Sequence, residues 1–287
     1  MTSITKRTWL KPRAAQVVLL WIAEHTALTV LALLFIAPIV FVFLTSFMSG
    51  DQTLTASLWP NPWDWQNYVR AFQAVPLAGW FSNSAVYAIL ATVFMLLSSV
   101  PAAYVLAKIK FRGSSVLFFA IIIAMLLPPQ VTIVPIYVMW ANLGLTGTLW
   151  PLILPNLLGD AFSIFLLRQF FLTIPSSYAD AARIDGNGEW GVLLRVIIPM
   201  AKPGIAAAAI FTFFHAWNDY FGPLLYTSEN PANWPAAYGL ATFHSLHGTD
   251  WGTTMAVTLL VTVPVVIVFF FAQRTFVEGI TLTGVKG

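Results

Sequence analysis

The sequence predicts an all-α, polytopic membrane protein with six transmembrane helices, and three observations lead to this fold class. The chain has 287 residues, of which 59% are hydrophobic and 9% are charged, whereas about a quarter of the residues in soluble domains are charged. Its apolar residues gather in six segments, each near the length of about 20 residues that a bilayer crossing needs. Its basic residues and tryptophans divide between the segment ends as six crossings would require.

The six apolar segments are each expected to form one helical span. They cover residues 17–47, 84–107, 116–140, 149–172, 203–226 and 254–276. The first is longer than a crossing requires, so we expect its membrane part at 27–47, after Glu24 and His25. A cleaved signal peptide is the alternative, but its apolar run is usually about 7–15 residues and ends at a small-x-small site. The sequence favours a retained helix.

The basic residues predict the orientation. With the N-terminus in the cytoplasm, Arg70 alone falls outside, and the other thirteen of the 14 Lys and Arg residues fall inside: Lys6, Arg7, Lys11, Arg13, Lys108, Lys110, Arg112, Arg168, Arg183, Arg195, Lys202, Arg274 and Lys286. Eight tryptophans lie in or beside the expected outer loops, where amphipathic rings favour the headgroup zone: Trp59, Trp63, Trp65, Trp80, Trp140, Trp150, Trp234 and Trp251. Both termini are therefore expected in the cytoplasm.

The chain is expected to be a single domain, 1–287. No repeat or linker divides it, and we expect three cytoplasmic parts: an N-terminal tail (1–16), a loop (175–203) and a C-terminal tail (277–287). The net charge of +3 follows from the topology, so no nucleic-acid partner is indicated. There is no cysteine, and the four histidines have no metal-ligand spacing, so no metal site is expected.

Residues 175–203, called the polar loop below, are too polar to cross a bilayer and too patterned for an irregular connection. Ser177 and Asp180 have the spacing of a capping box, which predicts a helix over 178–185 that ends at Gly186. A second helical run is expected at 189–198, after which Pro199 and Pro203 turn the chain into the fifth span. Two interpretations remain open: a docking helix for another protein, or a helix lying on the membrane surface.

The polar loop resembles the EAA motif of ABC importer permeases. Asp180, Ala181 and Ala182 fill its first part, Gly186 has the expected spacing, and 196–199 (VIIP) ends it. Other stretches are similar to carbohydrate-uptake permeases of the MalG-like family over nearly the whole chain: 83–84 (NS), 102–104 (AAY), 111–113 (FRG), 127–130 (LPPQ), 135–137 (PIY), 165–168 (FLLR), 216–219 (AWND), 279–281 (GIT) and 285–287 (VKG).

This resemblance implies a type I ABC importer permease fold in a bacterial plasma (inner) membrane, with a short coupling helix between the fourth and fifth helices. It implies a non-catalytic subunit that translocates a sugar (mono-, di- or oligosaccharide) delivered by an extracytoplasmic solute-binding protein. The implied partners are a second homologous permease and two ATPase subunits, which use ATP and Mg. The implied coupling residues are Asp180, Ala181, Ala182, Arg183, Asp185 and Gly186.

Polar residues inside the membrane suggest a second site. A buried carboxylate is costly there without a partner or water, and sugars are bound by planar hydrogen-bonding groups beside an aromatic face. Trp217, Asn218, Asp219 and Tyr220 supply those groups in the fifth span. The alternative is that Asn218 and Asp219 bond to a neighbouring helix as structural contacts. Asp160 is expected to mark a helix break with a structural role, and Pro128, Pro129 and Pro135 to kink the third span.

Other function classes are less well supported by the sequence. No G-x-x-x-x-G-K-[ST] occurs in the chain, so it is not expected to bind ATP itself. A secondary-active carrier would share the spans and the buried acid, but it more often has inverted repeats. An intramembrane enzyme would need a nucleophile, base or metal cluster, and none is evident. A glycerol-phosphate-type substrate remains the alternative to a sugar.

Overall fold

The computed structural model describes residues 14–55, 57–246 and 250–284, and every regular element in these residues is helical. The prediction of an all-α protein is therefore confirmed. Residues 1–13 of the expected N-terminal tail and the last three residues lie outside the described part.

Within the described part, four helical segments are long and apolar enough to cross a membrane, and two bent helix pairs bring the number to six if each pair is one span. The four segments are α1 (Ala14–Thr45), α3 (Leu77–Lys108), a run of α6 (Trp150–Ile153), η2 (Leu154–Leu158) and α7 (Ala161–Thr173), and α14 (Trp251–Gly284). The pairs are α4 (Ser114–Leu126) with α5 (Pro129–Asn142), and Glu189–Met200 with α11 (Lys202–Trp217).

The third predicted span is bent much more sharply than a proline kink. Helices α4 and α5 meet at 95°. Leu127 and Pro128 both have extended backbone at the break, with ψ of 120° and 129°, because a proline disfavours helical geometry in the residue before it. Pro135 lies inside α5. The expected kink is confirmed at Pro128, where it separates two helices, and residues 116–140 form one span if this bent pair is counted as one.

The fifth and sixth spans also differ from prediction. Helix α11 ends at Trp217, and a separate short helix, α12 (Phe221–Tyr226), follows. The expectation of one helix over 203–226 is wrong because Asp219 interrupts it and accepts a hydrogen bond from the Gly222 N–H (3.0 Å). Helix α14 continues to Gly284, so the tail expected from residue 277 is helical over most of its length.

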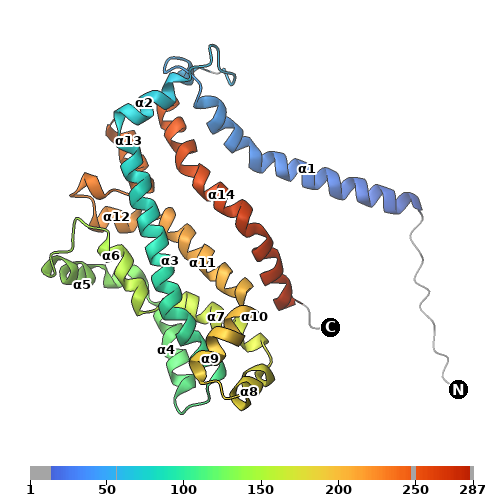
Figure 1. Ribbon diagram of the computed structural model, residues 1–287. Coiled ribbons are helices and arrows are strands. Elements are labelled where there is room, and N and C mark those ends of the chain that lie inside the picture. Colours follow the sequence, from blue (N-terminus) through green and yellow to red (C-terminus); the bar gives the residue numbers. More distant parts are fainter. Residues whose placement is uncertain (1–13, 56, 247–249, 285–287) are drawn as a thin grey trace.

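Helix α3 is the centre of the bundle (Figure 1). It packs against α7, η2 and α11, and α11 packs in turn against α14. The polar loop, drawn in yellow around α8 and α9, lies at one end of the bundle, which we call the loop end. The opposite end carries η1 (Gln52–Leu54), α2 (Gln66–Ala74), η4 (Pro231–Asn233) and α13 (Ala236–Leu246).

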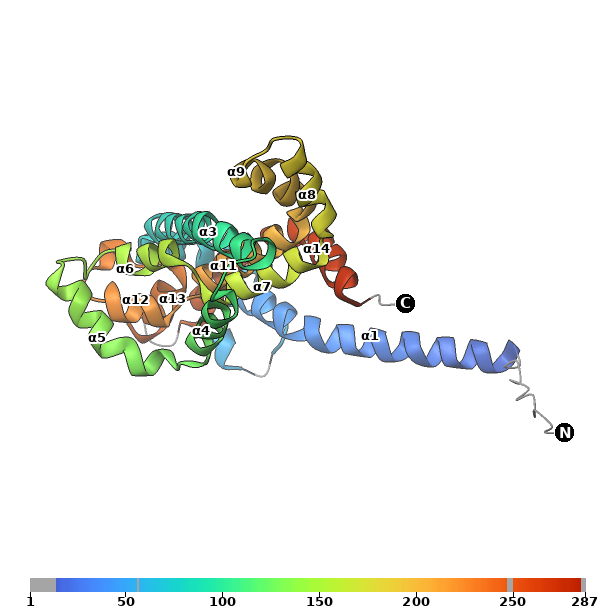
Figure 2. The ribbon, with the colours of Figure 1, turned by 90° about the horizontal axis from the view of Figure 1, so that it is seen from below.

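Helix α1 stands away from the rest of the bundle. Figure 1 shows it meeting the other helices only at the end opposite the loop, and Figure 2, from below, shows it extending beyond them. No residue of its apolar window is buried. Burial begins where the helix ends, at Thr45 to Met48.

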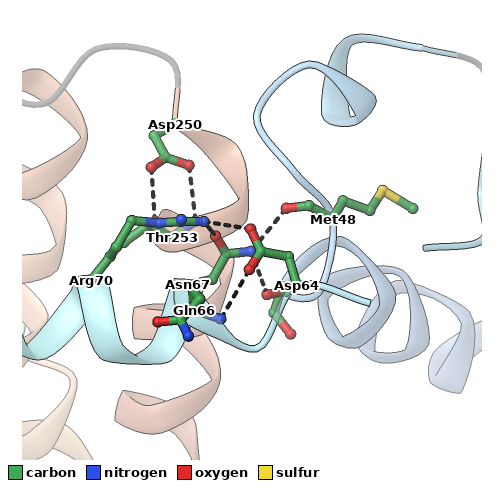
Figure 3. Close-up of polar contacts among 8 residues, drawn as sticks. Met48, Asp64, Gln66, Asn67, Arg70, Asp250 and Thr253 are labelled. Carbon is green, nitrogen blue, oxygen red and sulfur yellow. Dashed lines mark hydrogen bonds and ion pairs between the residues drawn. The ribbon is translucent and has the colours of Figure 1, made fainter. Parts of the chain in front are cut away.

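One side chain, that of Asn67 on α2, fixes the end of α1 (Figure 3). It is fully buried, and its amide nitrogen donates to the carbonyl oxygens of Ser46 (2.9 Å) and Met48 (2.8 Å). Its amide oxygen accepts from Arg70, which also pairs with Asp64 at 2.7 Å. These bonds satisfy two backbone carbonyls in the buried segment that follows α1.

Candidate functional site

The first helix of the polar loop is α8 (Ser176–Ile184), one to two residues earlier than predicted. The expected capping box does not form. The N-cap residue is Pro175, whose side chain makes no capping hydrogen bond, and Ser177 already lies inside the helix. The prediction is wrong because Pro175, with φ of −56° and ψ of 135°, is itself the last extended residue before the helix.

The predicted end of this helix is confirmed. Gly186 has a φ of +83°, in the left-handed region that glycine adopts without strain. Its N–H donates to the carbonyl of Arg183 and the N–H of Asn187 donates to that of Ala182, both at 3.0 Å. These two bonds define a Schellman motif, which satisfies carbonyls at the helix end.

Helix α8 has a buried face and an exposed face. Ala179 and Ala182 are buried in the protein's own core. The other face presents Tyr178, Ala181 and Ile184, and Ile184 is 86% exposed. Tyr178 and Ile184 thus leave apolar side chains exposed on the outer face of this helix. Ala182 therefore packs inward, and the exposed face is available to a partner.

A polar cluster fixes α8 to its neighbours. The Arg183 guanidinium donates to both carboxylate oxygens of Glu189 (2.8 and 3.1 Å) and to Asp180 (2.8 Å). The hydroxyl of Tyr104, on α3, donates to Glu189 at 2.5 Å. The hydrogen bonds from Arg183, and then from Tyr104, hold the pKa of Glu189 below its usual range. Three helices thus meet at one carboxylate. Asp185, the remaining predicted coupling residue, is the exposed C-cap residue of α8.

No sequence pattern predicted a role for Glu189 or Tyr104. Their contact joins positions 85 residues apart, and no local spacing could have predicted it. The only signal was that Tyr104 lies in one of the stretches similar to carbohydrate-uptake permeases.

The second helical run of the polar loop is confirmed at its predicted place. It consists of α9 (Glu189–Val192), a π-helical turn η3 (Leu193–Ile197) and α10 (Ile198–Met200). Val192 and Ile197 are fully buried. The chain then bends by 83° before α11, with Pro203 in the first turn of that helix. The polar loop therefore continues directly into the fifth span.

In the fifth predicted span, two of the four predicted pathway residues point inward. Trp217 is buried, and its indole N–H donates to the carbonyl of Val261 on α14 at 3.2 Å. Asp219 accepts from the hydroxyl of Tyr87 on α3 at 2.9 Å, besides the Gly222 N–H described above. Both side chains connect α11 or its end to neighbouring helices.

The other two pathway residues are exposed. Asn218 donates its amide to the carbonyl of Phe214 (2.8 Å), and Tyr220 is 44% exposed, with its ring 5.7 Å from that of Tyr238. The four residues therefore do not converge on one point. Asp160 accepts from the Ser163 N–H (2.6 Å) as the N-cap of α7, which is the structural role expected for it.

Comparison with known proteins adds three findings. Residues 99–281 match the family described as "Binding-protein-dependent transport system inner membrane component". The chain is 30% identical to the diacetylchitobiose uptake system permease protein NgcG of Streptomyces coelicolor, over 90% of this chain and 86% of the relative. It is 33% identical to the sn-glycerol-3-phosphate transport system permease protein UgpE of Yersinia pestis, over 89% and 94%.

Among solved structures, the chain is similar to one in the crystal structure of a bacterial ABC transporter involved in the import of the acidic polysaccharide alginate. The TM-score is 0.79 at 25% identity, covering 93% of this chain and 99% of that one.

Proposed function

This chain belongs to the family of binding-protein-dependent transport system inner membrane components, and from that premise we propose that it is one of two homologous permease subunits of an ATP-binding-cassette importer. It is a membrane-embedded transporter subunit. This membership favours the importer over the secondary-active carrier considered above.

The proposed assembly supplies what this chain lacks. Because the sequence contains no phosphate-binding loop, two separate ATPase subunits would bind and hydrolyse ATP with Mg, and no cofactor would be bound here. An extracytoplasmic binding protein would deliver the substrate. The polar loop would face the cytoplasm of a bacterial inner membrane together with both termini, as the distribution of basic residues indicates.

The observation that carries this proposal is helix α8, held firmly to the bundle on one face and exposed on the other. Ala179 and Ala182 and the Arg183–Glu189 pair anchor it, and Ile184 and Tyr178 present apolar surface outward. A partner that binds this face can move α8 only together with α3 and the run leading into α11. We assign ATPase coupling to Asp180, Ala181, Ala182, Arg183, Asp185 and Gly186, with Ala182 acting through packing.

We propose a carbohydrate as the substrate. The relative NgcG is named for diacetylchitobiose uptake, and the similar solved structure for alginate import. The relative UgpE is named for sn-glycerol-3-phosphate, so that chemistry is the second candidate. For the membrane pathway, the exposed Asn218 and Tyr220 are the proposed substrate contacts, and Trp217 and Asp219 are proposed to keep the break after α11 in place.

The test is reconstitution of this chain with the second permease, the ATPase and the binding protein in vesicles. We expect uptake of one carbohydrate that requires ATP and loaded binding protein. Uptake driven by an ion gradient, without ATP or partners, would contradict the importer. Uptake of glycerol phosphate but of none of the sugars would replace the substrate and leave the importer intact.

Variants of the two kinds of pathway residue provide the second test. Asp219→Leu removes the acceptor for Tyr87 and for the Gly222 N–H, so we expect lower complex recovery. Asn218→Ala removes an exposed amide and should leave recovery unchanged while reducing substrate-stimulated ATPase activity. If Asp219→Leu assembled normally and lost only the stimulation, Asp219 would contact the substrate instead.

A further inference from the structure

A cavity of about 480 Å³ lies at the loop end of the bundle, where the end of α3, the start of α4 and the end of α7 come together. Three cationic side chains line it: Lys108, Lys110 and Arg168. Ser114 and Ser176 add hydroxyl groups. Its volume falls within the range of roughly 300–1,000 Å³ that is typical of ligand pockets.

The three cations have no carboxylate partner among the described residues. Lys108 donates its ammonium to the carbonyl of Ile174, and the Arg168 Nε donates to that of Leu106 at 3.2 Å. Lys110 is exposed and takes part in none of the hydrogen bonds or ion pairs found there. The hydrogen bonds of the cations thus go to neutral carbonyl groups, and Asp180 attracts Lys108 only from beyond ion-pair distance.

The acids nearest to this cavity are already engaged. Asp180 and Glu189 line an adjoining cavity that shares Lys108 and Lys110 with the first. Both carboxylates are paired with Arg183, at 2.8 Å each. One guanidinium neutralises only one of the two carboxylates, so the four basic and two acidic side chains of the adjoining cavities together carry an excess of two positive charges, which favours an anionic ligand.

An apolar cavity continues from the basic one toward the middle of the bundle. It has a volume of about 570 Å³, lies between α3 and α4, and shares Leu106 and Phe111 with the basic cavity. Its wall includes Leu117 and Ala120, which are exposed on α4. A small inorganic anion would leave this apolar surface uncovered, whereas an acyl chain would bury apolar area along it.

We propose that the two cavities form one site for an anionic glycerophospholipid. The phosphate group lies among Lys108, Lys110 and Arg168, and one acyl chain follows the groove between α3 and α4. Basic pockets between transmembrane helices at a membrane surface bind acidic headgroups in this way. The site needs only a membrane-embedded chain and does not depend on which solute is transported.

The test is native mass spectrometry of the full chain purified from membranes with its accompanying subunits. The probes are dioleoyl phosphatidylglycerol, dioleoyl phosphatidylcholine and inorganic phosphate. We expect one phosphatidylglycerol to be retained preferentially. Lys110→Gln should weaken its binding about fivefold, as expected for one basic residue at an anionic surface. Lys202→Gln is the matched control, because this exposed cation lies at the same end outside both cavities.

Further arms separate the groove from the charges. Ala120→Phe should fill the groove and weaken phosphatidylglycerol binding while all three cations remain. Lys108→Gln should add to the effect of Lys110→Gln; if loss of the bond to Ile174 prevents folding, Lys110→Gln carries the test alone, since Lys110 takes part in no recorded bond.

Four results would overturn the proposal. These are equal retention of the two lipids, an equal loss with Lys202→Gln, displacement of the lipid by inorganic phosphate at equal concentration, and loss of a protein subunit but not of lipid with Lys110→Gln. The last result would identify the basic cavity as a protein interface. All readouts measure lipid or subunit retention, so a failed transport assay would not affect them.

Discussion

Replacing Gly186 by alanine should damage coupling in a way that the neighbouring Gly188 does not. A Cβ built at either glycine meets nothing within 4 Å, so neither substitution adds a steric clash. The backbone differs: φ is +83° at Gly186 and −70° at Gly188. Only Gly186 lies in the left-handed region, where an L-residue costs roughly 1–2 kcal/mol.

The cost falls on the end of α8. Relief of the strain requires opening the two bonds of the Schellman motif, which leaves the carbonyls of Ala182 and Arg183 without these donors. A penalty of about 1–2 kcal/mol lowers the ratio of ordered to disordered helix ends by roughly 5- to 30-fold. If the partner binds the ordered form, its apparent affinity falls by the same factor when the ordered form becomes the minor state.

The assay measures ATPase recovery in a pull-down and ATPase stimulation by loaded binding protein, with thermal unfolding of each variant as the folding control. We expect Gly186→Ala to lose both signals in part, while Gly188→Ala, which changes only the N-cap residue of α9, should cost less, about 0.5 kcal/mol. Equal behaviour of the two variants would refute the reasoning, because the backbone at 186 would then carry no functional constraint.

Three further predictions concern residues that the structure alone revealed. Glu189→Gln should lower the stability of the loop end by less than about 1 kcal/mol, since the Arg183–Glu189 ion pair is partly exposed. Because folding lowers the pKa of Glu189, this stabilisation is present above about pH 4.3 and is lost as the pH falls through the pKa of Glu189 in the folded protein. The variant should lack this loss of stability in acid. Asn67→Leu should lower the melting temperature, as it leaves two buried carbonyls without donors at about 1–3 kcal/mol each, whereas the exposed Gln66→Leu should not. Gly204→Ala should destabilise by roughly 1–3 kcal/mol through overpacking, because its Cβ would lie 2.5–2.9 Å from ring atoms of Phe170; a melting temperature not restored by adding Phe170→Leu would contradict this.

The sequence predicted the features that one or two neighbouring residues determine, and it missed those that depend on a wider context. The end of α8 at Gly186 follows from one residue's backbone preference, and the break at Pro128 from the exclusion of helical geometry before proline. The predicted start of α8 was wrong because a capping-box pattern at Ser177 cannot outweigh the extended backbone that Pro175 already supplies. The interruption of the helix after Trp217 was not predicted, because hydropathy averaged over a window of residues does not show a short break.

The candidate site was predictable only in part for the same reason. The polar loop was located by composition and by its motif. The carboxylate that joins its helices to α3 was not, since Tyr104 and Glu189 are distant in sequence. The resemblance implied a coupling role for Ala182, but helical periodicity alone cannot tell which face of the helix packs on the core, and the structure buries Ala182.

The detached position of α1 has a consequence for how the protein is made. Hydrocarbon chains solvate a leucine-rich helix about as well as another helix does, so a span with no buried face is stable in lipid as soon as it is inserted. Membrane insertion and subunit assembly are therefore separable in time. A newly synthesised copy can therefore remain in the bilayer before it assembles, with α1 contacting α14 and the segment Thr45–Met48 buried at its end.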